Sequence, residues 1–79
     1  MRRLETEIAE GRRLISHGQR PVYHVSTRYD GTAVDVRIRE LPVIHVFVAD
    51  ESSVLDGARA LIARTLGVDA STFEVEPER

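Results

Sequence analysis

The sequence predicts an α+β fold, in which a three-stranded antiparallel meander and a short fourth strand carry one main helix, preceded by an N-terminal helix. Turn residues between two alternating runs predict a hairpin, an apolar run predicts a third strand, and apolar residues at helical spacing predict the main helix. The expected helices span residues 2–16 and 54–66, and the expected strands span residues 22–29, 32–39, 43–48 and 73–75. The order is therefore helix, three strands, helix, strand.

The main helix has the clearest pattern. Its apolar residues recur at steps of three and four and share one stripe: Val54, Leu55, Ala58, Leu61, Ile62 and Leu66. Ser53 followed by Asp56 has the form of a capping box at the start. Gly67 suits the left-handed conformation that ends a helix. Gly57 costs about 1 kcal/mol of helix stability relative to Ala, and close packing of the helix on the sheet would explain its presence.

The hairpin is expected around the pair Asp30-Gly31, which favours a two-residue type I′ turn. Such a turn would place Val25 opposite Val36. One face of the two strands is then largely apolar and the other mostly polar, as in an antiparallel sheet with one buried face.

The third expected strand is apolar on both faces. Val43 and Phe47 lie on one side with His45, and the other side carries Ile44, Val46 and Val48. This pattern is typical of a central strand or of a strand at an interface. A single main helix covers one face of the sheet, so the second apolar row needs another cover.

Two covers are expected for that row, the N-terminal helix or a second protein chain. The N-terminal helix has a thin apolar stripe and is interrupted by Gly11. We therefore expect a homodimer formed through the third strand, its edge or the N-terminal helix. The candidate interface residues are Leu4, Ile8, Ile15, Val43, Ile44, His45 and Phe47.

No pattern in the sequence predicts catalysis. His17, His24 and His45 have no second ligand at a recognised metal spacing. The carboxylates, including Glu40, are expected in loops and helix caps, the serines have no nucleophile elbow, and the glycines form no phosphate loop. The sequence therefore predicts a protein that is not an enzyme, without a cofactor or a metal site.

Charge and hydropathy narrow the class of partner. The formal net charge of −2 gives no general attraction to nucleic acid. Arginines crowd the first quarter of the chain, but Glu5, Glu7 and Glu10 are interleaved with them, so nucleic-acid contact there is expected to be weak. No segment has the length and apolarity of a membrane span or the apolar core of a signal peptide. A cytoplasmic protein is expected.

Residues 22–75 resemble the HicB-like antitoxin domain, and most closely its short actinobacterial members. The resemblance lies in the strand ending Tyr29-Asp30-Gly31, the segment Glu40-Leu41-Pro42, the capped helix with its run Ala58-Arg59-Ala60-Leu61-Ile62-Ala63, and the tail from Leu66 to Val75. It implies a partial RNase H-type fold for residues 21–76, with residues 1–20 as an added helix and turn. It also implies a partner, because HicB antitoxins neutralise the small RNase toxin HicA, and full-length members typically add a DNA-binding segment.

Two other functions fit the same order of elements. Double-stranded-RNA-binding domains also run helix, three strands, helix, but they need basic residues at the start of the second helix. Here Asp50, Glu51 and Asp56 occupy that region, and a fourth strand follows. The second alternative is a structural or assembly protein, which the sequence does not separate from an antitoxin.

Overall fold

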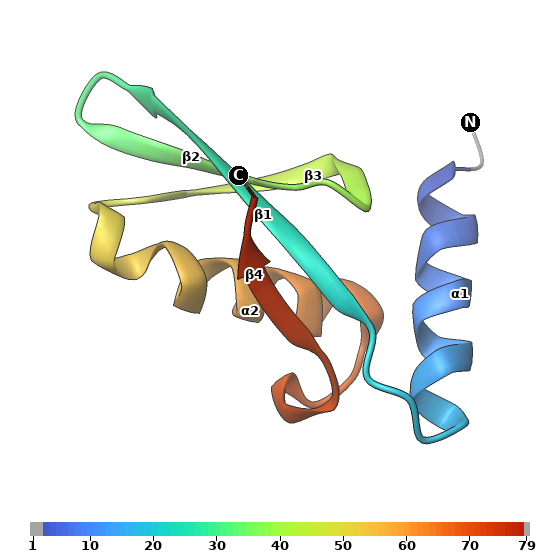
Figure 1. Cartoon of the computed structure of the whole chain (residues 1–79). Helices are drawn as coiled ribbons and strands as arrows, with labels where there is room; N and C mark the ends of the chain where they lie inside the picture. Colours follow the sequence, from blue (N-terminus) through green and yellow to red (C-terminus); the bar gives the residue numbers. More distant parts are fainter. Residues whose placement is uncertain (1–2, 79) are drawn as a thin grey trace.

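The computed structural model describes residues 3–78. Its helices and strands are α1 (Arg3–Ser16), β1 (Val22–Asp30), β2 (Ala33–Ile38), β3 (Leu41–Val48), α2 (Val54–Leu66) and β4 (Glu74–Pro77), with short 3-10 turns at Glu51–Ser53 and Ala70–Thr72. The four strands form one sheet in the order β3-β2-β1-β4 (Figure 1). The β1–β2 and β2–β3 pairs are antiparallel, and β4 runs parallel to β1. The expected α+β class and order of elements are confirmed. The expected start of α1 at residue 2 lies outside the described residues.

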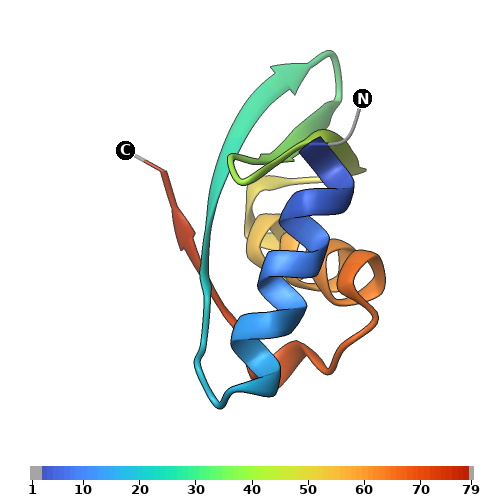
Figure 2. The same cartoon turned by 90° about the vertical axis from the view of Figure 1, so that its right-hand side faces the viewer.

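Both helices lie on the same side of the sheet (Figure 2). The side chains that fill the space between helices and sheet are buried: Tyr23, Val25, Val34, Val36, Ile38, Leu41, Val54, Ala58, Leu61, Ile62, Leu66 and Phe73. Tyr23 and Phe73 meet edge to face, with ring centroids 5.8 Å apart. Val25, Val36 and Ile38 of the sheet are buried together with Leu61 and Ile62 of α2.

α1 is part of this core. Leu4, Ile8 and Ile15 are partly buried and pack against the central cluster. Gly11 is also buried, and a side chain there would overlap the hydroxyl of Tyr23. Its missing side chain therefore allows α1 to approach the domain. No helix within residues 3–78 is long and apolar enough to span a membrane.

The start of α2 differs from the expected capping box. Ser53 adopts helical backbone angles (φ −95°, ψ 0°), and its side chain caps no helix amide. The hydroxyls of Ser52 and Ser53 instead donate to Asp50 Oδ1, over 2.7 and 3.1 Å, and these bonds lower the pKa of Asp50. The capping prediction was wrong because a 3-10 turn precedes the helix and brings both hydroxyls back onto Asp50.

The end of α2 is as predicted, with Gly67 at φ 71° and its amide bonded to the Ala63 carbonyl. One member of the predicted stripe differs. Leu55 is 40% exposed because the buried stripe passes through its neighbour Val54.

The hairpin register is shifted from the expected one. Asp30 pairs with Ala33 and Val25 with Ile38, so the turn residues are Gly31 and Thr32 rather than Asp30 and Gly31. Gly31 has φ 66°, and no non-glycine residue among those described has a positive φ. A type I′ turn needs positive φ at both central positions, whereas glycine at the first position alone fits type II′. The slip is two residues, so each side chain stays on its predicted face.

β3 is longer than expected and lies at an edge of the sheet. It begins at Leu41 and includes Pro42, whereas the sequence predicted a start at residue 43. A register irregularity between Arg37 and Ile38 brings Leu41 opposite Ile38. Of the two positions suggested by its apolar faces, the central one is wrong, because β2 lies on one side of β3 and no strand of residues 3–78 lies on the other. The position at an interface stays a prediction.

Candidate interaction surface

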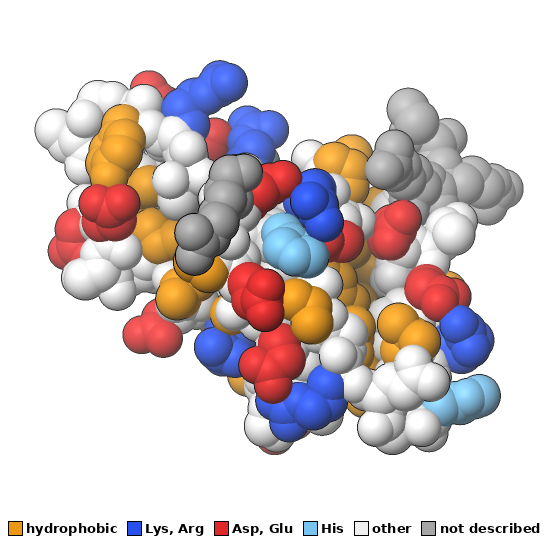
Figure 3. Space-filling model, in the orientation of Figure 1, with side chains coloured by type: hydrophobic (Ala, Val, Ile, Leu, Met, Phe, Trp, Pro, Cys, Tyr) orange, Lys and Arg blue, Asp and Glu red, His pale blue; other side chains and the backbone are white. Residues whose placement is uncertain are grey.

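The face of the sheet turned away from both helices is here called the open face. Alternation along the strands places the following side chains on it: Val22, His24, Ser26 and Arg28 of β1, Asp35 and Arg37 of β2, Val43, His45 and Phe47 of β3, and Glu74 and Glu76 of β4. Figure 3 shows the part of the surface over β1 and β4, where acidic and basic side chains are interspersed with apolar ones. No described helix covers this face.

The apolar part of the open face belongs to β3. Val43 is 58% exposed and Phe47 is 51% exposed, although both lie within a strand. His45 stands between them, and its ring meets Phe47 edge to face with centroids 5.5 Å apart. These three side chains form a row along the outermost strand.

A carboxylate on β2 holds this row in place. Asp35 is only 5% exposed. Its Oδ1 lies 2.9 Å from His45 Nδ1, and its Oδ2 accepts a 3.0 Å hydrogen bond from Arg37 Nε. Burial alone would raise the pKa of Asp35, but the contacts with His45 and Arg37 outweigh it and hold the pKa below its usual value. Asp35 therefore remains charged at neutral pH and fixes the His45 ring beside Phe47.

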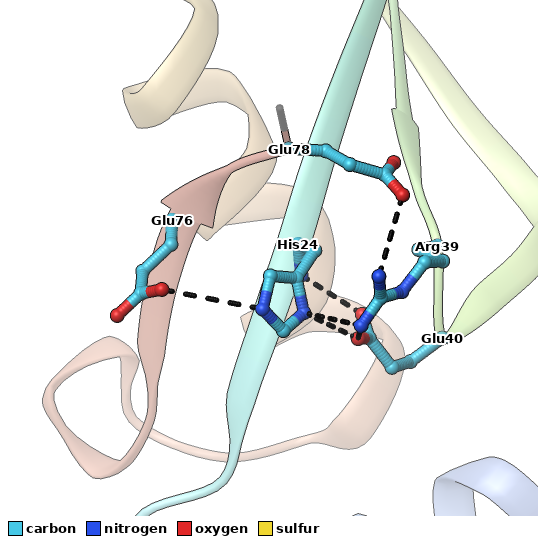
Figure 4. A network of polar contacts seen from close by, with 5 residues as sticks. All are labelled: His24, Arg39, Glu40, Glu76 and Glu78. Carbon is cyan, nitrogen blue, oxygen red and sulfur yellow. Dashed lines mark hydrogen bonds and ion pairs between the residues drawn. The ribbon is translucent and has the colours of Figure 1, made fainter.

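A second polar network lies over β1 and β4 (Figure 4). The backbone amide of His24 donates to Glu40 Oε1 over 2.8 Å, and its ring Nδ1 lies 2.6 Å from Glu40 Oε2. Arg39 lies 3.4 Å from both Glu40 and Glu78, and His24 Nε2 lies 4.0 Å from Glu76. Burial raises the pKa of Glu40, but the bonds from His24 more than offset this and the pKa is lowered. The network joins the turn after β2 to the end of β4.

The histidines do not come together. β2 lies between the strands that carry His24 and His45, so these two histidines do not lie on neighbouring strands. His17 is exposed beyond the end of α1. Among the described residues, no three histidine, aspartate or glutamate side chains are grouped to hold a metal ion.

A groove of about 600 Å³ lies between β1, the start of α2 and the end of β4. Its lining includes Ser26, Glu51 and Glu78, and no histidine among the residues described. It therefore lacks the pairing of a hydroxyl with an imidazole base that nucleophilic catalysis by serine commonly uses.

The structure divides the predicted interface residues into two sets. Leu4, Ile8, Ile15 and Ile44 are partly buried and pack against the core of their own chain. Val43, His45 and Phe47 are exposed on the open face. α1 therefore does not cover the open apolar row.

Sequence reasoning missed Asp35 and Glu40. Asp35 lies on the polar face of an alternating strand, and nothing in that pattern shows that neighbouring strands bury it. Glu40 was expected as an ordinary loop residue, yet its carboxylate accepts a hydrogen bond from the backbone amide of His24 in β1. The short spacing between the end of β2 and the start of β3 was the only available sign that Glu40 sits in a tight, ordered connection.

Comparison of the chain with models of protein families, with curated proteins and with solved structures finds no match.

Proposed function

We propose that this chain is a non-catalytic protein-interaction module of the HicB antitoxin type, which self-associates and binds a small HicA-like RNase toxin in the cytoplasm. The observation that carries the proposal is the open face, where Val43 and Phe47 are exposed on a strand without Asp, Glu, Lys or Arg while both helices pack on the opposite side. The resemblance of residues 22–75 to HicB-like domains supplies the class of partner.

The arrangement of side chains favours protein binding. A single exposed apolar residue is ordinary on a protein surface, but Val43 and Phe47 lie on one row with the His45 ring between them. Charged side chains, including Arg37, flank that row. An aromatic centre with a polar rim is the usual composition of a protein interface. Because Asp35 fixes His45, part of this surface is already ordered before a partner binds.

The test starts from the genes beside that of this chain, one of which the proposal expects to encode a small HicA-like RNase. The purified protein should bind that RNase and inhibit its cleavage of RNA. Phe47→Glu should weaken binding at least tenfold, about 1.4 kcal/mol, because it places an unpaired charge in the contact. Leu55→Glu is the matched control, since Leu55 is a similarly exposed apolar residue on α2, away from the open face.

Two results would contradict the proposal. One is wild-type protein that neither binds nor inhibits the RNase. The other is equal inhibition by Phe47→Glu and by Leu55→Glu, which would show that the open face is not the binding surface.

Double-stranded RNA is the less supported ligand. The region where such domains present basic residues, at the start of the second helix, here carries Asp50, Glu51 and Asp56. A gel-shift titration at low salt, where phosphate contacts are strongest, tests this alternative directly.

A further inference from the structure

β3 is an edge strand without the usual protection of an edge. Proteins normally shield such strands with charged residues, proline or a bulge. In β3 (Leu41–Val48) the proline and the register irregularity both lie at its beginning. The remaining residues, 43–48, carry no Asp, Glu, Lys or Arg. Their outer backbone groups face no other strand of residues 3–78.

The opposite edge of the sheet is protected. β4 (Glu74–Pro77) is short, carries two glutamates and ends in proline. A second copy that joined β3 to β4 would form an open chain of molecules, and this edge opposes it. Pairing of β3 with β3 of a second copy instead closes after two molecules. α1 lies near the beginning of β3 in both views and leaves the rest of its length free (Figures 1 and 2).

We infer that two copies of this chain pair through β3, antiparallel and centred on His45, so that the four strands of each copy join in one continuous sheet. This inference rests on the self-association in the proposed function and specifies its surface. Two-fold symmetry puts His45 opposite the same residue of the second copy. Val43 then faces Phe47 of the second copy on the open face, and Ile44 faces Val46 on the helix face.

Exposure selects this register among the symmetric ones. Val43 and Phe47 are the large hydrophobic side chains of β3 that are exposed, and centring on His45 places each against the other. An aromatic residue opposite a β-branched one is a favourable cross-strand pair. Centring on Val46 would set Val43 opposite Ala49, beyond the end of the strand. Centring on Ile44 would place Pro42 inside the ladder, opposite Val46, whereas centring on His45 leaves Pro42 in the last pair, opposite Val48.

The polar groups of β2 support the same arrangement. Asp35 holds His45 Nδ1 at 2.9 Å, and Arg37 occupies the other carboxylate oxygen. The imidazole at the centre of the proposed pair is thus held to its own sheet. Because this side chain bonds to β2, the outer backbone groups of β3 remain available for hydrogen bonds to the second copy.

The test is disulfide cross-linking, because the wild-type chain has no cysteine. Directly opposed residues of an antiparallel pair have Cβ atoms about 4.5–5.5 Å apart, close to the spacing that a disulfide spans. With oxidised glutathione, His45→Cys should give a covalent dimer. A mixture of Val43→Cys and Phe47→Cys chains should do the same and keeps His45 intact.

Two single variants are the controls. Val43→Cys alone should stay monomeric on a non-reducing gel, because equivalent Val43 residues would lie about 13 Å apart along the strand. Leu55→Cys, on α2, should also stay monomeric. Cross-linking of Val43→Cys alone as fast as in the mixture would overturn the register.

Sedimentation of the wild type distinguishes failure of the β3 pairing from failure of self-association. A wild-type dimer with no more cross-linking in His45→Cys and in the mixture than in Leu55→Cys would overturn the β3 pairing and leave self-association standing. A strictly monomeric wild type would overturn both, whereas binding of the RNase toxin is measured independently.

Discussion

Gly57→Ala sets two opposed effects against each other at the contact between α2 and β3. Replacing glycine by alanine inside a helix gains about 1 kcal/mol of helix propensity. Here, however, the added methyl group would lie 2.7 Å from Cγ1 of Val48. That atom belongs to a β-branched side chain with a stiff χ1 angle, so it gives way only if the helix or the strand shifts. Such overpacking costs about 1–3 kcal/mol. We expect Gly57→Ala to reduce the free energy of unfolding by up to about 2 kcal/mol.

A double-mutant cycle with Val48→Ala checks this reasoning. Val48→Ala removes the obstructing methyl groups, and the next neighbour of the added methyl group, Val46 Cγ1, lies at an ordinary 3.9 Å. In that background Gly57→Ala should become stabilising, with a coupling energy of at least about 1 kcal/mol. Urea titrations of the four proteins measure it. Stabilisation by Gly57→Ala in the wild-type background would refute the close contact of α2 with β3.

Three further predictions concern the core, the His24 network and metal binding. Leu61→Ala should cost about 2–5 kcal/mol through lost burial and a cavity, and a loss below about 0.5 kcal/mol in denaturant titration would contradict the packing of α2. Because the pKa of Glu40 is lowered from 4.5 in the folded protein, its ionised form adds stability that is complete above pH 4.5 and lost as the pH falls through the lowered pKa. Thermal melts of wild type and Glu40→Gln should therefore differ at neutral pH and converge as the pH falls below 4.5, and a difference that stays constant throughout the acid range would contradict this. Metal analysis should find no stoichiometric zinc. One zinc per chain that is lost in His24→Ala or His45→Ala would overturn the prediction that the chain has no metal site.

The faces of the strands could be predicted from the sequence, and the cross-strand partners could not. Alternation in β1 and β2 determines which side chains point to the core, and a slip of two residues leaves that unchanged. Partners depend on the turn, where Asp30-Gly31 and Gly31-Thr32 both offer a two-residue connection. The choice depends on which residue takes positive φ, and only Gly31 does so among the described residues of this turn.

The sequence predicts that Val43 and Phe47 lie in one row of β3, but it does not predict on which side of the sheet that row lies. Both rows of β3 are apolar, so the sequence does not reveal whether Val43 and Phe47 or Ile44 and Val46 lie under α2. The structure resolves this through Gly57, which has Val48 and Val46 as its nearest neighbours. The burial of Asp35 was also hidden, because it depends on His45 and Arg37 being brought to the same carboxylate from two strands.

β3 is apolar on both faces, but packing within one chain covers only one of them. Gly57 lets α2 sit directly on Val46 and Val48, and Gly11 lets α1 sit beside α2 on the same side of the sheet. Both helices therefore pack on the same face of the sheet. The close contacts that hold them there prevent either helix from covering the open face. Any cover for Val43 and Phe47 among residues 3–78 would require one helix to leave a core in which Leu66 and Ile62 are fully buried. The rearrangement would expose far more apolar surface than the two side chains it covers, so a second chain is the more economical cover.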